Sequence, residues 1–125
     1  MNITRKSEGK HAVVLALSGN ITGGPDAELF SSTLEELIGE GRKNVLLDLK
    51  SVKWVNSTGL GILISGLHKL RNLGGAMKIV NMSDRIDNIF SVTKLNLVFE
   101  VFTEEVEALR SFRPAEDASS GKPTS

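Results

Sequence analysis

The chain has 125 residues, of which 40% are hydrophobic and 24% are charged, a size and composition that fit one ordinary globular domain. Fifteen basic and fifteen acidic side chains give a net charge of zero, so the positive field that direct binding to nucleic acid requires is absent. The chain contains no cysteine, which excludes disulfides, thiolate metal sites and cysteine nucleophiles and fits a reducing compartment. No apolar run reaches the roughly 20 residues of a membrane span, and the first residues lack a secretory signal. We therefore expect a cytoplasmic protein without membrane contact.

In the first half of the chain, two apolar runs frame a helical pattern. The continuous apolar run at residues 11–17 predicts a buried strand that pairs in a hairpin with residues 3–7. From Asp26 onwards apolar residues recur at helical spacing, and Gly39 and Gly41 end that helix. Residues 44–49 are short and apolar, which predicts a second buried strand followed by a polar turn.

The second half continues the alternation of helices and strands. A helix is expected to begin at or just after residues 56–58 and to end before Gly74, with a short core strand at residues 77–80 after it. Ser83 is a candidate cap for a brief helix. A strand at 98–102 and a final helix through Phe112 complete the pattern. The predicted domain therefore spans residues 1–113, and residues 114–125 have the composition of a disordered tail.

This order of elements defines the fold class. Strands alternating with helices predict a single α/β domain with a mixed sheet of about four or five strands, flanked by about four helices. The only tryptophan, Trp54, is expected in the core.

The sequence contains little that suggests an enzyme. His11 begins an apolar strand and His68 lies beside a helical stripe, so both read as structural or surface residues. No metal-binding spacing, phosphate-binding loop, complete dinucleotide fingerprint or serine nucleophile elbow is present. We expect no catalytic residue, no metal and no cofactor.

The most informative segment runs from Asp48 to Gly61, where a strand, a turn and the start of a helix follow one another. One interpretation makes Asn56 or Ser57 a helix N-cap, worth about 1 kcal/mol. Two glycines, Gly59 and Gly61, fall in the first helical turns, where each costs about 0.5–1 kcal/mol relative to alanine. They indicate that some close backbone approach is needed. A serine at a helix N-terminus is also a favourable place for a phosphate group.

The chain resembles the STAS family, the anti-sigma-factor antagonists of bacteria, from about Ile3 to Phe112. The resemblance rests on residues 16–21 after the first long strand, on residues 45–49, and on the Ser-Thr-Gly-Leu-Gly signature at residues 57–61. Residues 73–75 before the strand at 77–80 and the last helix at 104–112 also fit.

The resemblance implies a phosphorylation switch at Ser57. In the family, a cognate anti-sigma-factor serine kinase of the GHKL type phosphorylates the corresponding serine, and a PP2C-type phosphatase removes the phosphate. The unphosphorylated antagonist binds the kinase and thereby frees its sigma factor. Thr58 is a second hydroxyl, whose role as a β-branched first-turn residue is at least as well supported as phosphorylation. The partner-binding residues expected on this basis are Thr22, Gly23, Gly24, Asn56, Ser57, Thr58, Gly59, Leu60 and Gly61.

Two positions depart from the family pattern. Asn56 stands where the family usually has Asp immediately before the phosphoserine, and Thr22 replaces a second common Asp. Both changes remove a negative charge near Ser57 and keep a hydrogen-bonding side chain.

The residues leave other functions open. A STAS-type scaffold subunit of a lipid-transport ABC complex, or of a multi-component stress sensor, would have the same sequence pattern. A binder of small molecules or nucleotides would show a concave pocket with convergent polar groups. A monomer or a weak dimer is expected.

Overall fold

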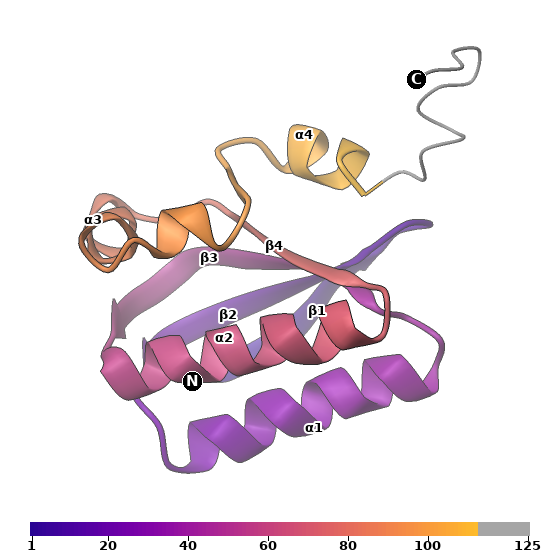
Figure 1. Cartoon of the computed structure of the whole chain (residues 1–125), viewed down its shortest axis with the longest axis horizontal. Helices are drawn as coiled ribbons and strands as arrows, with labels where there is room; N and C mark the ends of the chain where they lie inside the picture. The colour runs from indigo at the N-terminus through magenta and orange to yellow at the C-terminus, as the bar shows by residue number, and fades with distance from the viewer. Residues whose placement is uncertain (113–125) are drawn as a thin grey trace.

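In the part of the chain that the structure describes, five strands form one sheet in the order in which they occur along the sequence. The computed structural model describes residues 1–112 (Figure 1), and the tail predicted at residues 114–125 lies outside this range. The first pair of strands is antiparallel and every later pair is parallel. The strands are β1 (Asn2–Glu8), β2 (Val13–Ile21), β3 (Asn44–Val55), β4 (Ala76–Val80) and β5 (Val101–Phe102).

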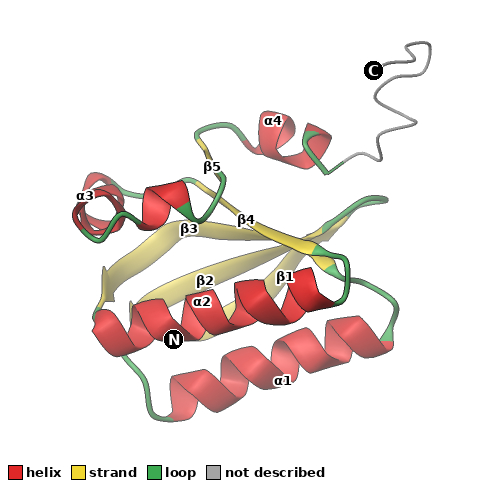
Figure 2. Cartoon of the chain, in the orientation of Figure 1, coloured by secondary structure: helices red, strands yellow, loops and turns green. Residues whose placement is uncertain are grey.

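Within residues 1–112, four α-helices flank this sheet, which confirms the predicted α/β fold with a mixed sheet (Figure 2). Helices α1 and α2 lie side by side on one face of the sheet, and α4 lies on the other face. Helix α3 follows β4 and packs on β3. The helices are α1 (Pro25–Gly39), α2 (Ser57–Asn72), α3 (Asp84–Val92) and α4 (Glu105–Arg110), with a short 3-10 helix at Leu95–Leu97.

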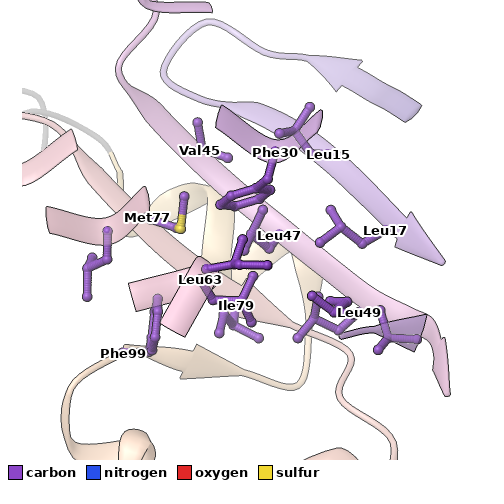
Figure 3. Close-up of a cluster of buried hydrophobic side chains, with 14 of the residues drawn as sticks. Leu15, Leu17, Phe30, Val45, Leu47, Leu49, Leu63, Met77, Ile79 and Phe99 are labelled. Atoms are coloured by element: carbon purple, nitrogen blue, oxygen red, sulfur yellow. The ribbon is translucent and has the colours of Figure 1, made fainter. Parts of the chain in front are cut away.

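The main core lies between the sheet and the pair α1 and α2. Alternate residues of β2, β3 and β4 point to the same side and meet the apolar stripes of the two helices (Figure 3). Phe30 from α1 and Leu63 from α2 are almost completely buried there, and burial of side chains of this size contributes about 1.5–3 kcal/mol each. The apolar residues whose helical spacing predicts α1 and α2 are therefore the residues that pack against the sheet.

The opposite face of the sheet carries two buried charged residues, Asp48 and Lys78. The Lys6 ammonium lies 2.7 Å from the Asp48 carboxylate and 2.8 Å from the Glu105 carboxylate. Lys78 donates to the Ser111 hydroxyl at 2.9 Å and lies over the Phe112 ring. These contacts attach α4 to the sheet.

Strand β3 is longer than predicted, because it continues through the segment 50–55 that was expected to be a polar turn. Relative to β2, β3 contains one extra residue between Asp48 and Ser51 and another between Val52 and Trp54. Such bulges break the alternation of a strand. The buried residues Leu49, Val52 and Val55 consequently recur every third residue, a spacing that does not indicate a strand.

Two further expectations need correction. The strand predicted at 98–102 is reduced to Val101–Phe102. Leu95 and Phe99 turn into the main core, so the chain begins to pair with β4 only after them. Trp54 is not a core residue: 44% of its surface is exposed. The bulge after Val52 places Trp54 on the opposite side of the strand from the buried Val55.

Candidate functional site

The loop after β2 and the start of α2 meet at the carboxyl ends of two neighbouring parallel strands. Ile21, the last residue of β2, pairs with Val55, the last residue of β3. The amide of Asn56 then donates to the Ile21 carbonyl at 3.3 Å. This register brings the segment 22–24 beside the segment 56–58.

Asn56 caps helix α2 and also holds the neighbouring loop. Its Oδ1 accepts a hydrogen bond from the Gly59 amide at 2.8 Å, and its Nδ2 donates to the Thr22 carbonyl at 3.3 Å. The predicted N-cap is therefore confirmed at Asn56 and not at Ser57. The same side chain joins the two segments that form the site.

Ser57 and Thr58 are the first two residues of α2, and both are exposed. A helix begins with four amide groups that have no partner within the helix. Here Ile21 accepts from the amide of Asn56, and the Asn56 side chain accepts from that of Gly59. Among the described residues, the Ser57 and Thr58 amides are the two left without an acceptor, next to the Ser57 hydroxyl.

The close backbone approach expected from Gly59 and Gly61 exists at only one of them. A Cβ atom on Gly59 would overlap the carbonyl oxygen of Ile21 and would lie 2.7 Å from its carbonyl carbon. Gly59 therefore lets the first turn of α2 pack on the end of β2. A Cβ atom on Gly61 would meet no atom within 4 Å, so the fold itself does not require this glycine.

The loop after β2 has a backbone that depends on two glycines. Gly23 and Gly24 have φ values of 107° and 60°, a region that side chains strongly disfavour. A Cβ atom on Gly23 would lie 2.7 Å from Cγ2 of Thr58, so the Thr58 methyl group is packed against the loop. This packing supports the interpretation of Thr58 as a structural residue of the first helical turn.

Asp26 is a site residue that the sequence analysis missed. Its carboxylate accepts from the Thr22 amide at 3.0 Å. The Thr22 amide, followed by a smaller contribution from the chain's N-terminal ammonium, holds the pKa of Asp26 below its ordinary value despite an opposing effect of burial. The first turn of α1 therefore places one carboxylate against the loop, although Thr22 itself is neutral. An acidic residue in the first turn of a helix is common, so no separate sequence signal marks this contact.

The predicted partner-binding residues divide into two groups by exposure. Gly23, Gly59 and Leu60 are buried, so they shape the site from beneath and present no surface to a partner. Asn56 is half-buried. The exposed members are Thr22, Gly24, Ser57, Thr58 and Gly61.

A second polar cluster lies on the other face of the sheet, away from this site. Burial by itself would raise the pKa of Asp48. Hydrogen bonds from Lys6, from the Lys50 amide and from Asn81 outweigh that effect and hold the pKa below its ordinary value. Conversely, the hydrogen bonds to Asp48 and Glu105 raise the pKa of Lys6. Because Lys6 joins Asp48 of the sheet to Glu105 of α4 and these charges are paired, we assign the cluster to stability.

Comparison with known proteins identifies the family. The family model of the STAS domain matches residues 3–108. The chain belongs to the STAS domain family, as the resemblance at residues 57–61 indicated. Across the described residues, no helix is both long enough and apolar enough to span a membrane.

Several similar proteins are named as anti-sigma factor antagonists, and the fold also resembles parts of anion and sulfate transporters. The anti-sigma-B factor antagonist of Bacillus subtilis is 29% identical over 84 residues, which cover 66% of this chain and 77% of that protein. An anti-sigma factor antagonist from Mycobacterium paratuberculosis superposes with a TM-score of 0.73 at 22% identity, covering 90% of this chain and 96% of that one. The Bacillus cell fate determinant SpoIIAA in its phosphorylated form gives a TM-score of 0.66 at 18% identity, covering 90% and 100%. The first of these names describes an antagonist, in line with the expected binding module, and the two structures show a likeness of fold.

Proposed function

We propose that this protein is an anti-sigma-factor antagonist whose binding is switched by phosphorylation of Ser57. In the unphosphorylated form it binds an anti-sigma-factor serine kinase of the GHKL type, and the sigma factor is released. A PP2C-type phosphatase returns the phosphorylated form to the binding state. The observation that carries the proposal is the exposed Ser57 hydroxyl at the first position of α2, beside two amide groups without acceptors.

The covalent step adds and removes one phosphoryl group. The kinase transfers the terminal phosphoryl group of a nucleoside triphosphate to Oγ of Ser57, so that a new O–P bond forms and the bond to the nucleoside diphosphate breaks. The hydroxyl proton passes to a base of the kinase. The phosphatase hydrolyses the ester with water and yields inorganic phosphate and the original hydroxyl. Ser57 is the substrate in both reactions.

The phosphate acts at the surface and leaves the fold unchanged. It adds about −1.5 to −2 charges at pH 7, which the helix dipole and the amides of Ser57 and Thr58 stabilise by about 0.3–1 kcal/mol. At an interface shaped for a neutral serine, the same charge would have to be desolvated without a partner, with a penalty of several kcal/mol. Because Asn56 and Thr22 are neutral, most of the contrast between the two forms comes from the phosphate.

The test measures the melting temperature and the dissociation constant for the purified kinase, with and without phosphate on Ser57. We expect an unchanged or slightly higher melting temperature and an affinity lower by about a hundredfold or more. Mass spectrometry of Ser57→Ala and Thr58→Val after incubation with the kinase identifies the acceptor. Stoichiometric phosphate on the alanine variant would assign the switch to another residue. Absence of phosphate at Ser57 in the source cells, with an ABC ATPase co-purifying, would favour the scaffold function.

A further inference from the structure

A groove runs between α1 and α2, and at one end it is lined by Thr58, the residue after Ser57. It has a volume of about 230 Å³, and α1 and α2 are in contact beneath it. The buried Phe30 and Leu34 of α1, with Ile62 of α2, form an apolar floor. Small side chains form the two walls, namely Ala27 and Ser31 on α1 and Gly61 and Ser65 on α2.

The groove is open because α1 and α2 pack closely at its floor and carry small residues above it. A Cβ atom on Gly66 would lie 2.6 Å from the Phe30 ring and 2.9 Å from Cδ1 of Leu34. A larger residue therefore does not fit at position 66, where the two helices touch below the groove. At Gly61 the space is empty to at least 4 Å. A larger residue there would fill the groove without disturbing the fold, and an exposed helical glycine lowers stability relative to alanine.

The two rims of the groove differ in charge. Helix α1 carries Asp26, Glu28, Glu35 and Glu36 and no lysine or arginine. Glu28 and Glu35 are seven residues apart and therefore share one side of the helix, just outside the groove wall. Lys69 of α2 pairs with Glu35 at 2.6 Å, whereas no described cation pairs with the exposed Glu28. This rim is negative and has an unpaired carboxylate.

On α2, Lys69 lines the far end of the groove and is paired with Glu35, whereas the part of the rim that leads to the switch residue is uncharged. Ser57, Gly61 and Ser65 are spaced by four residues, so they follow one side of the helix. A segment lying along the groove would therefore cover Ser57 at one end. A phosphate on Ser57 would stand on the wall that such a segment must approach closely.

We propose that the groove receives an amphipathic helix of the protein partner, which places apolar side chains on the Phe30–Ile62 floor and a lysine or arginine opposite Glu28. The inference rests on the proposed function and names the chemistry of the partner segment. The volume is below the about 300–1,000 Å³ of small-molecule pockets, and an apolar groove between helices suits the apolar face of a third helix. The acidic rim selects a basic flank by charge complementarity.

The first experiment measures binding of the purified kinase to groove variants of the full chain. Gly61→Leu fills the groove, and Glu28→Lys reverses the charge of the unpaired rim. We expect each to weaken binding by about tenfold or more. Glu107→Leu and Glu107→Lys, at an exposed position of α4 on the other face of the sheet, are matched controls expected to bind as the wild type does. Thermal melting checks that all four variants are folded.

The second experiment identifies the segment that occupies the groove. Because the chain has no cysteine, Ser65→Cys provides a single thiol for a benzophenone cross-linker, and Glu107→Cys on α4 provides the control. We expect position 65 to cross-link a kinase peptide with helically spaced apolar residues and at least one lysine or arginine. Cross-links to a second copy of this chain, to an acidic peptide, or equally from position 107 would overturn the proposal.

The outcomes distinguish a failure of the proposed Ser57 switch from a failure of the groove proposal. If Ser57→Asp binds the kinase as tightly as the wild type does, the proposed switch is wrong. If Ser57→Asp abolishes binding while Gly61→Leu and Glu28→Lys bind normally, the switch stands and the groove proposal is wrong.

Discussion

Gly59 of α2 lies so close to Ile21 of β2 that a side chain of any size at position 59 would overlap the Ile21 carbonyl group. This contact sets the distance between the first turn of the helix and the end of the neighbouring strand. The Asn56 cap is built on the same contact, because the Asn56 amide donates to the Ile21 carbonyl oxygen.

The two glycines of the 57–61 signature should therefore respond in opposite ways to alanine. Gly59→Ala places a methyl group against backbone that cannot rotate away, so we expect a loss of about 1–3 kcal/mol or more in the free energy of unfolding. Gly61→Ala should raise stability by up to about 1 kcal/mol, because its Cβ meets open space in a helix. Urea unfolding of both variants measures this difference. Equal effects of the two substitutions would contradict it.

The Asn56 cap can be tested by two substitutions. Asn56→Ala removes the acceptor for the Gly59 amide and should lower the free energy of unfolding by about 0.5–2 kcal/mol. Asn56→Asp keeps an acceptor at a helix N-terminus, although it loses the hydrogen bond to Thr22, so we expect it to stay within about 1 kcal/mol of the wild type. Denaturant midpoints distinguish the two. An aspartate variant as unstable as the alanine variant would show that the bond to Thr22 dominates.

The Asp48–Lys6 ion pair should make the free energy of unfolding depend on pH. The native pKa of Asp48 lies below its ordinary value, so the stability that its charge contributes is complete above the unfolded pKa of about 3.9. It is lost as the pH falls through the native pKa. Asp48→Asn should lower stability by about 1–3 kcal/mol at pH 7, and the difference from the wild type should shrink below about pH 4.

Melting curves from pH 7 to pH 2.5 provide this measurement. Glu107→Gln, an exposed acid without an ion pair among the described residues, serves as the control and should follow the wild type. A constant difference between Asp48→Asn and the wild type at every pH would show that packing, and not charge, is responsible.

Trp54 offers an optical test of the site, because it is the only tryptophan and lies three residues before Ser57. With 44% of its surface exposed, its fluorescence should be quenched readily by iodide. Trp54→Ala should change the free energy of unfolding by no more than about 1 kcal/mol. Addition of the kinase should shift the emission if the interface includes this end of β3, and full protection from iodide in the free protein would contradict the exposed position.

Helices α1 and α2 could be predicted from the sequence because each buries one stripe against the same core, and the stripe is visible as a 3.6-residue period. The cap at Asn56 was also predictable, since a polar residue directly precedes the apolar stripe of α2. Both features depend on neighbours within a few residues.

The remaining features depend on residues distant in sequence. The end of β3 was missed because two bulges, which arise from pairing with β2, replace alternation by a spacing of three. The role of Gly59 could not be recognised because its contact, Ile21, belongs to a different strand. Asp26 resembled an ordinary first-turn acid until the structure placed the Thr22 amide beside it.

The outermost strands also limit how another protein can attach. At one edge, β1 is irregular between Arg5 and Ser7 and carries charged side chains, and at the other, β5 has only two residues. In the described part of the chain, neither edge offers a long, flat row of free backbone groups onto which a foreign strand could be added. Recognition by β-augmentation is therefore disfavoured, and the same geometry protects the sheet against edge-to-edge aggregation at high concentration.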